Sequence, residues 1–118
     1  MKVVDRDPTL SLCMIVRDEE EALPVCLASV QGIVDEMVIV DTGSQDRTVE
    51  VARGYGARVY HFPWDDDFSA ARNESLRRAT GDWVLCLDAD ERLNPEDAQR
   101  VKGLIRELDP CPEVMAVN

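Results

Sequence analysis

An apolar run that stops abruptly at two aspartates is the most informative stretch of this sequence: WVLCLDADE, residues Trp83–Glu91. The run predicts a buried strand over 82–87. Strand residues alternate between two faces, so Asp88 and Asp90 are expected to project together from the strand's carboxyl end. Paired hard carboxylates suit Mg²⁺ or Mn²⁺ carrying a phosphate, and open α/β sheets bind ligands at this edge. The alternative interpretation is an acidic loop that caps the next helix.

On both sides of this stretch, apolar runs alternate with segments of helical periodicity along the chain. Strands are predicted over 10–16, 37–40, 58–62 and 82–87, helices over 22–30, 46–55, 68–79 and from 95 onward, and a further strand over 114–117. The last helix carries an apolar stripe formed by Ala98, Val101, Leu104, Ile105 and Leu108. This order predicts an α/β fold with a Rossmann-type, mostly parallel sheet and helices on both faces. Because the sequence stops within a predicted strand, we expect residues 1–118 to be part of a longer protein.

The composition of the chain argues against two classes of binding partner. The chain has 118 residues and a net charge of -11, which argues against nonspecific binding to nucleic acid or to an anionic membrane. No apolar run is long enough to span a bilayer and the N-terminus lacks a signal-peptide core, so we expect a cytoplasmic protein. Membrane association would then come only through regions outside this chain. The four cysteines form no Cys-X-X-Cys pair and are interpreted as reduced thiols.

Three further residues lie where strand ends and helix starts are predicted, and each has two interpretations. Asp41 follows the second strand, where its carboxylate would accept hydrogen bonds from a ribose or a base, or would only cap the turn after it. Arg17 would face a nucleotide, or pair with the acidic run 18–21. Arg72 would offset the charge of a phosphate or a base, or pair with the aspartates of 65–67.

Four segments in this order resemble family 2 glycosyltransferases with the GT-A fold: 12–19, 38–48, 71–73 and 81–91. The resemblance covers about Leu10 to Asn118. It implies the N-terminal, donor-binding portion of such an enzyme. The implied ligand is a nucleotide-diphosphate sugar, expected to be UDP-linked, and the implied cofactor is Mn²⁺ or Mg²⁺.

The resemblance also implies roles for individual residues. The implied donor-binding residues are Val16, Arg17, Asp41, Arg72 and Asp88. By the same resemblance, Asp88 and Asp90 form the metal-binding DXD pair, with Asp90 as the principal ligand. The sequence departs from many members at Thr42, where they carry a second acid, and this puts the base contacts in question.

Catalysis needs more than this donor site. Inverting members of the family use a general base that deprotonates the acceptor hydroxyl, and the resemblance implies that this residue lies beyond the DXD pair. Neither Glu91 nor Glu113 fits that role convincingly, so no catalytic residue is assigned. We therefore expect residues 1–118 to bind the donor and to transfer poorly, and the acceptor is not identified. An exposed sheet edge or apolar patch would also permit a homodimer of this portion.

Two other functions fit part of the sequence. A non-catalytic nucleotide-binding or interaction module would keep the same fold without transferring a sugar. A sugar nucleotidyltransferase shares the sheet and the metal site, but it typically carries a glycine-rich, basic loop after the first strand. The corresponding segment here, Arg17–Glu21, contains no glycine.

Overall fold

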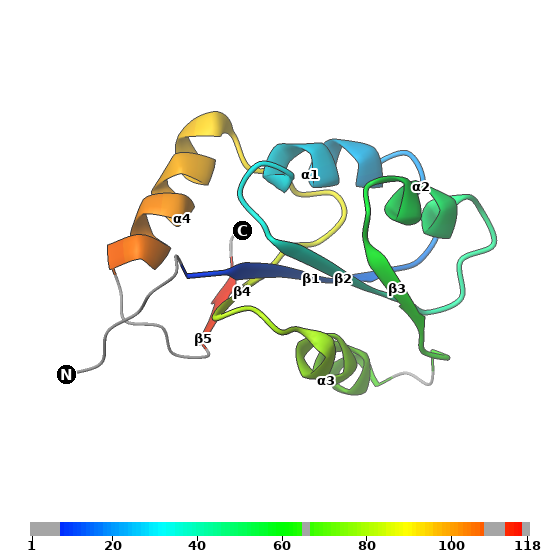
Figure 1. Cartoon of the computed structure of the whole chain (residues 1–118). Coiled ribbons are helices and arrows are strands. Elements are labelled where there is room, and N and C mark those ends of the chain that lie inside the picture. The colour runs from blue at the N-terminus through cyan, green and yellow to red at the C-terminus, as the bar shows by residue number, and fades with distance from the viewer. Residues whose placement is uncertain (1–7, 65–66, 108–112, 117–118) are drawn as a thin grey trace.

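The computed structural model of this chain describes residues 8–64, 67–107 and 113–116, in which strands and helices alternate (Figure 1). The elements are β1 (Leu10–Val16), α1 (Leu23–Val30), β2 (Glu36–Asp41), α2 (Thr48–Gly54), β3 (Arg58–His61), α3 (Phe68–Arg78), β4 (Trp83–Cys86), α4 (Pro95–Glu107) and β5 (Glu113–Ala116).

Within the described residues the strands form one five-stranded sheet in the order β3-β2-β1-β4-β5. Every neighbouring pair is parallel, which confirms the predicted fold class. The chain runs from β1 outward to β3 and then crosses back to β4 on the other side of β1. The order in which strands are added to the sheet therefore reverses between β1 and β4. In open α/β sheets, ligands bind at the carboxyl ends of the strands at such a switch point.

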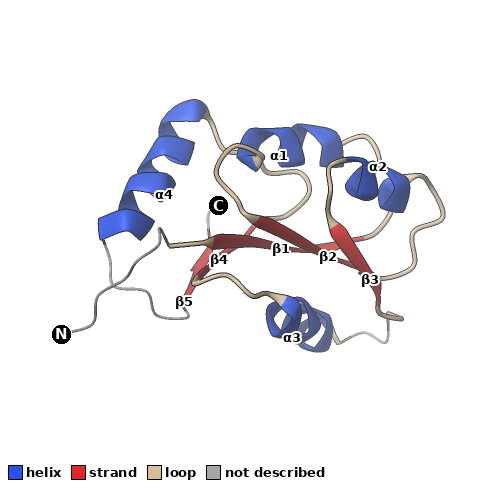
Figure 2. Ribbon diagram, in the orientation of Figure 1, coloured by secondary structure: helices blue, strands red, loops and turns tan. Residues whose placement is uncertain are grey.

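The helices cover the two faces unequally. Figures 1 and 2 show α1, α2 and α4 on one side of the sheet and α3 on the other. Alternate residues of β1 face the two sides: the Met14 sulfur lies 4.0 Å from the Cys26 sulfur of α1, whereas the Cys13 thiol donates to the Ser75 carbonyl of α3. The largest group of buried apolar side chains lies under α1 and α4.

Most predicted elements are confirmed within one or two residues, and two local predictions are wrong. Strand β4 ends at Cys86, so Asp88 and Asp90 are not strand residues. Leu104 is 43% exposed and does not belong to the buried stripe of α4. Leu108 and Cys111 lie outside the described residues.

The start of α4 is capped by the residue before it. The Asn94 side-chain oxygen accepts a hydrogen bond of 2.8 Å from the backbone of Asp97, and Pro95 begins the helix. Backbone N–H of Leu93 donates to the Ser29 hydroxyl of α1 at 3.1 Å, which joins the two helices. Among the described residues, no helix combines the length and apolarity that crossing a bilayer requires.

A polar cluster at the amino ends of the strands joins β1, β2 and the turn before β4. The Ser11 hydroxyl donates to Glu36 at 2.6 Å and accepts from the backbone of Gly81 at 2.8 Å. Both the backbone and the hydroxyl of Thr80 also donate to Glu36. Burial favours a raised pKa for Glu36, but these hydrogen bonds and the Arg58 charge outweigh it, so its pKa lies below the ordinary value.

We predict that Gly81→Ala destabilises the fold by about 1–3 kcal/mol, since an added Cβ overpacks this cluster. That atom would lie 2.5 Å from the Ser11 hydroxyl oxygen and 2.9 Å from the Ser11 backbone nitrogen. The matched control is Gly103→Ala in α4, where nothing lies within 4 Å of the added atom. That change is expected to be neutral or to stabilise by up to about 1 kcal/mol. Urea unfolding of both variants measures the difference, and equal midpoints would contradict the prediction.

We predict that Glu36→Gln lowers stability at pH 7 by about 1–3 kcal/mol, because hydrogen bonds to a charged acceptor are lost. A carboxyl whose folded pKa is depressed contributes stability above its unfolded pKa and loses it as pH falls through the folded value. The gap between wild type and variant should therefore shrink on acidification below the ordinary glutamate range. Urea unfolding across that pH range tests this, and a gap that is constant with pH would refute it.

Candidate functional site

Asp41 at the end of β2 is buried and directed into the turn that follows it. Its carboxylate accepts hydrogen bonds from the backbone of Gly43 at 3.3 Å, the backbone of Ser44 at 3.2 Å and the Ser44 hydroxyl. Nδ1 of the exposed His61 lies 3.5 Å from the same carboxylate. The structure thus shows the turn-capping interaction, and contact between Asp41 and a nucleotide stays a prediction.

The acidic run after β1 is attached to the loop after β2 through its backbone. Backbone N–H of Asp18 donates to the Ser44 hydroxyl at 2.9 Å, and the Asp18 carboxylate accepts from Gln45 at 2.7 Å. Backbone N–H of Glu19 donates to the buried hydroxyl of Thr48 at 2.7 Å. Asp18 adopts a positive φ of 51° to make these contacts. The two loops therefore form one rim along this edge of the sheet.

Val16 and Arg17 lie on this rim. Val16 is the register partner of Asp41, and its carbonyl accepts from the backbone of Thr42 at 3.1 Å and from the Thr42 hydroxyl at 3.3 Å. A carboxylate at position 42 would have no proton to donate to this carbonyl. Arg17 is exposed, and it forms no ion pair with the acidic run or with any other described residue.

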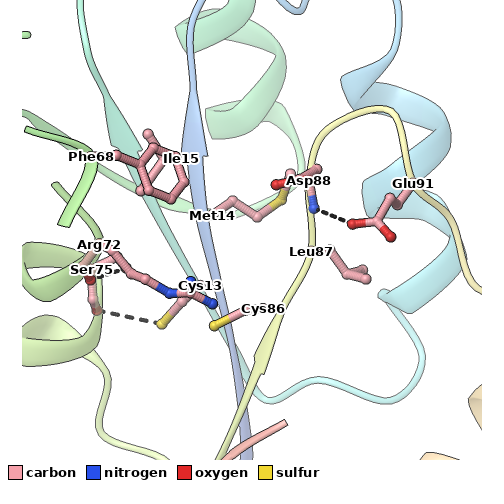
Figure 3. A pocket seen from close by; sticks show the side chains of 10 residues that line it. All are labelled: Cys13, Met14, Ile15, Phe68, Arg72, Ser75, Cys86, Leu87, Asp88 and Glu91. Atoms are coloured by element: carbon pink, nitrogen blue, oxygen red, sulfur yellow. Dashed lines mark hydrogen bonds between the residues drawn. The ribbon is translucent and has the colours of Figure 1, made fainter. Parts of the chain in front are cut away.

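A cavity of about 210 Å³ opens at the carboxyl ends of β1 and β4, on the side of the sheet that α3 covers (Figure 3). Its lining residues are Cys13, Met14, Ile15, Phe68, Arg72, Ser75, Cys86, Leu87, Asp88 and Glu91. Among the predicted site residues it brings together Arg72 and Asp88. Val16, Arg17, Asp41 and Asp90 are not part of its lining.

Arg72 reaches the cavity from the second turn of α3. This helix begins at Phe68, and the Asp67 carboxylate caps it by accepting from the backbone of Ala70 at 3.0 Å. In Figure 3 the Arg72 side chain extends from α3 toward β1 and β4. It forms no ion pair with any described residue, and Asp65 and Asp66, two of its alternative partners, lie outside the described residues.

Asp88 and Asp90 belong to a tight turn. Backbone N–H of Glu91 donates to the Asp88 carbonyl at 2.9 Å, and the Glu91 carboxylate accepts from the backbone of Asp88 at 2.9 Å. Both aspartates are exposed while Ala89 between them is 5% exposed. Both aspartates therefore lie in a turn after the strand, and strand alternation does not set the directions of their side chains.

The donor set of this turn fits a hard divalent cation. Burial, followed by the charges of Glu91, Asp90 and Asp88, raises the pKa of the Cys26 thiol beneath the turn to about 11. None of the three carboxylates pairs with a cation in the described residues. No group of three or more His, Cys, Asp or Glu side chains poised to hold a metal occurs there either. Two exposed carboxylates therefore suit Mg²⁺ or Mn²⁺ whose remaining ligands are phosphate oxygens and water.

Sequence reasoning missed the rest of the pocket wall. Phe68 lies one turn before Arg72, and that spacing alone could have placed both on one helix face. The neighbouring positions of Cys13 and Cys86 follow only from the pairing of β1 with β4. That pairing depends on strand order, which no local pattern in the sequence specifies.

A parallel α/β sheet with a charged pocket where the strand order reverses is typical of nucleotide-binding folds. The sequence model described as Glycosyl transferase family 2 matches residues 11–117. The chain therefore belongs to glycosyl transferase family 2, which confirms the resemblance drawn from its motifs.

Relatives support this membership. A TPR repeat-containing protein of Synechococcus elongatus is 62% identical over 84 residues, which is 71% of this chain and 21% of the relative. The SPbeta prophage-derived glycosyltransferase SunS of Bacillus subtilis is 30% identical over 104 residues, covering 86% of this chain and 25% of that protein. The chain thus spans about a quarter or less of the length of these relatives.

Solved structures show the same fold. Glucosyl-3-phosphoglycerate synthase of M. tuberculosis superimposes with a TM-score of 0.62 at 29% identity, over 75% of this chain and 36% of that one. A complex of that enzyme with Mn²⁺, UDP-glucose and phosphoglyceric acid gives a TM-score of 0.61 at 26% identity, over 72% and 35%. S. aureus TarS (residues 1–349) matches with a TM-score of 0.68 at 24% identity, over 84% and 32%, and shows the fold alone.

Proposed function

We propose that this chain is the donor-binding portion of a glycosyltransferase that uses a nucleotide-diphosphate sugar, UDP-linked, with Mn²⁺ or Mg²⁺. The observation that carries the proposal is the meeting of Arg72 and Asp88 in one pocket at the reversal of the sheet. A cation from α3 and a carboxylate after β4 are the two charges that a metal-bound diphosphate needs. The M. tuberculosis enzyme that binds Mn²⁺ and UDP-glucose supports the assignment.

Charge explains why Arg72 matters to this proposal. The chain carries a net charge of -11, so a diphosphate approaching it meets a repulsive field. The Arg72 guanidinium, which forms no ion pair with a described residue, would offset that repulsion locally, and its planar fork can donate two hydrogen bonds to phosphate oxygens. Arg72 would therefore bind the anionic part of the donor directly.

Asp88 and Asp90 are the residues that would hold the metal ion. When bound, such an ion neutralises the charge that develops on the diphosphate leaving group as the sugar–phosphate bond breaks. Glu91 would support them indirectly, because its bond to the Asp88 backbone fixes the turn. The buried Ala89 anchors that turn, so both carboxylates stay on its exposed side.

The rim residues would bind the nucleoside. Arg17 is exposed and unpaired among the described residues, and Val16 presents its backbone at the same edge. Asp41 would chiefly hold the turn after β2 in place. Its carboxylate already accepts from Gly43 and Ser44 and lies beside His61, so a base or ribose donor would have to replace one of these contacts.

The complete reaction requires residues that are not assigned here. The enzyme would transfer the sugar to an acceptor hydroxyl, which a base outside the residues named above would deprotonate. We further propose that the protein is cytoplasmic, binds no nucleic acid and contacts a membrane only through regions outside these residues. This portion would also form a homodimer.

We predict saturable binding of UDP in Mn²⁺, measured by titration calorimetry, and its loss in EDTA. GDP and CDP serve as controls for the base. The double variant Asp88→Ala/Asp90→Ala should bind UDP equally weakly with and without Mn²⁺, because the metal ligands are gone. Unchanged metal-dependent affinity in that variant would exclude these residues as the metal site.

We predict that Arg72→Gln weakens UDP binding at least about tenfold, which corresponds to about 1.4 kcal/mol. The matched control is Arg100→Gln, an exposed position on α4, which should leave UDP affinity unchanged. Equal affinities for wild type and Arg72→Gln in the same calorimetric assay would show that the pocket does not bind the diphosphate.

A further inference from the structure

Two cysteines lie next to each other on the floor of the pocket. Cys13 of β1 and Cys86 of β4 are register partners on neighbouring parallel strands, and both line the cavity. Register partners of a parallel pair project to the same face, and adjacent strands lie about 4.8 Å apart. Figure 3 shows the two side chains meeting below Arg72.

The two thiols differ in their access to solvent. Cys13 is 2% exposed, and its thiol donates to the Ser75 carbonyl at 3.4 Å. Cys86 is half-buried and open to the cavity. Burial raises the pKa of Cys13 to about 12, and the neighbouring Cys86 adds to that rise, which is a second sign that the sulfur atoms are close.

Cys26 provides an internal contrast. It lies on α1, across the sheet from the pocket, where its sulfur contacts the Met14 sulfur at 4.0 Å. It is fully buried and does not line the cavity. Cys111 is outside the described residues. Position in the fold therefore singles out Cys13 and Cys86 as a pair.

We propose that Cys13 and Cys86 are a redox-active dithiol that forms a reversible disulfide across the pocket floor when a peroxide enters the cavity. Neighbouring strands hold paired α-carbons within the range of about 4.4–6.8 Å that disulfides span. A modification site in the pocket follows from this pairing alone and does not depend on which ligand the pocket binds.

The chemistry proceeds in two balanced steps. Hydrogen peroxide oxidises the accessible Cys86 thiol to a sulfenic acid, and the O–O bond breaks to release one water. The Cys13 sulfur then attacks the Cys86 sulfur, the S–O bond breaks, and the hydroxyl leaves with the Cys13 proton as a second water. Two thiols lose two electrons, which the peroxide gains. Two equivalents of a small thiol reverse the reaction and leave as their own disulfide.

Oxidation would change the pocket itself. Forming the S–S bond draws the Cys13 sulfur away from the Ser75 carbonyl, which removes a contact between β1 and α3. Ile15 and Leu87 line the same cavity, so the bond would lie close to both. The cavity would therefore differ between the reduced and the oxidised chain.

The test is peptide mapping of the wild-type chain after exposure to hydrogen peroxide. Remaining thiols are blocked with N-ethylmaleimide, and the unreduced protein is digested with trypsin and analysed by mass spectrometry. Tryptic peptides 7–17 and 79–92 should be found joined, and the free thiols should fall from four to two. Treatment with glutathione should restore all four. Oxidation of Cys86 with Cys13 still a free thiol would overturn the proposal.

Variants separate this linkage from random oxidation. Cys86→Ser should leave Cys13 unmodified, whereas Cys13→Ser should let Cys86 proceed to the sulfinic acid, because no resolving thiol is present. The matched control Cys26→Ser should form the 13–86 linkage as wild type does. Equal amounts of disulfide from other cysteine combinations would contradict a specific pair.

Discussion

Parallel pairing of β1 with β2 on one side and β4 on the other is the constraint on which the rest of the structure depends. It puts Val16 beside Asp41 and Cys13 beside Cys86, so groups far apart in sequence meet at one edge of the sheet. Parallel strands need a crossover connection between them. The crossover from β3 to β4 contains α3 and lies on the face of the sheet opposite α1, α2 and α4. Arg72 reaches the pocket only because of that passage.

Local interactions determine where negative charge accumulates on this acidic chain. The backbone of Asp18 and Glu19 is satisfied by hydroxyl groups of Ser44 and Thr48, so the acidic run is held without a basic partner. Its carboxylates meanwhile extend the negative field around the rim. A polyanionic ligand would enter only where a cation interrupts that field, and this gives the few basic groups near the pocket an influence beyond their number.

Sequence reasoning succeeded where a local pattern dictates structure. The apolar run 10–16 became β1 with its predicted bounds, and the placement of Arg72 and Asp88 at element ends put both in one pocket. It failed where tertiary geometry decides. Asp41 is occupied by its own turn, and the two aspartates after β4 lie in a turn because the strand ends earlier than its apolar run. No local signal could have paired Cys13 with a residue more than seventy positions away.

Because the helices cover the two faces of the sheet unequally, the main apolar core and the ligand cavity lie on different faces. Most of the large buried side chains lie under α1 and α4, while the cavity opens on the α3 side, where Val84 is only half-buried. Substitutions in the cavity wall thus fall mostly outside the main apolar core. Residues of the cavity wall can therefore be substituted with little change to the main core, which makes the α3 face the place to redesign ligand specificity.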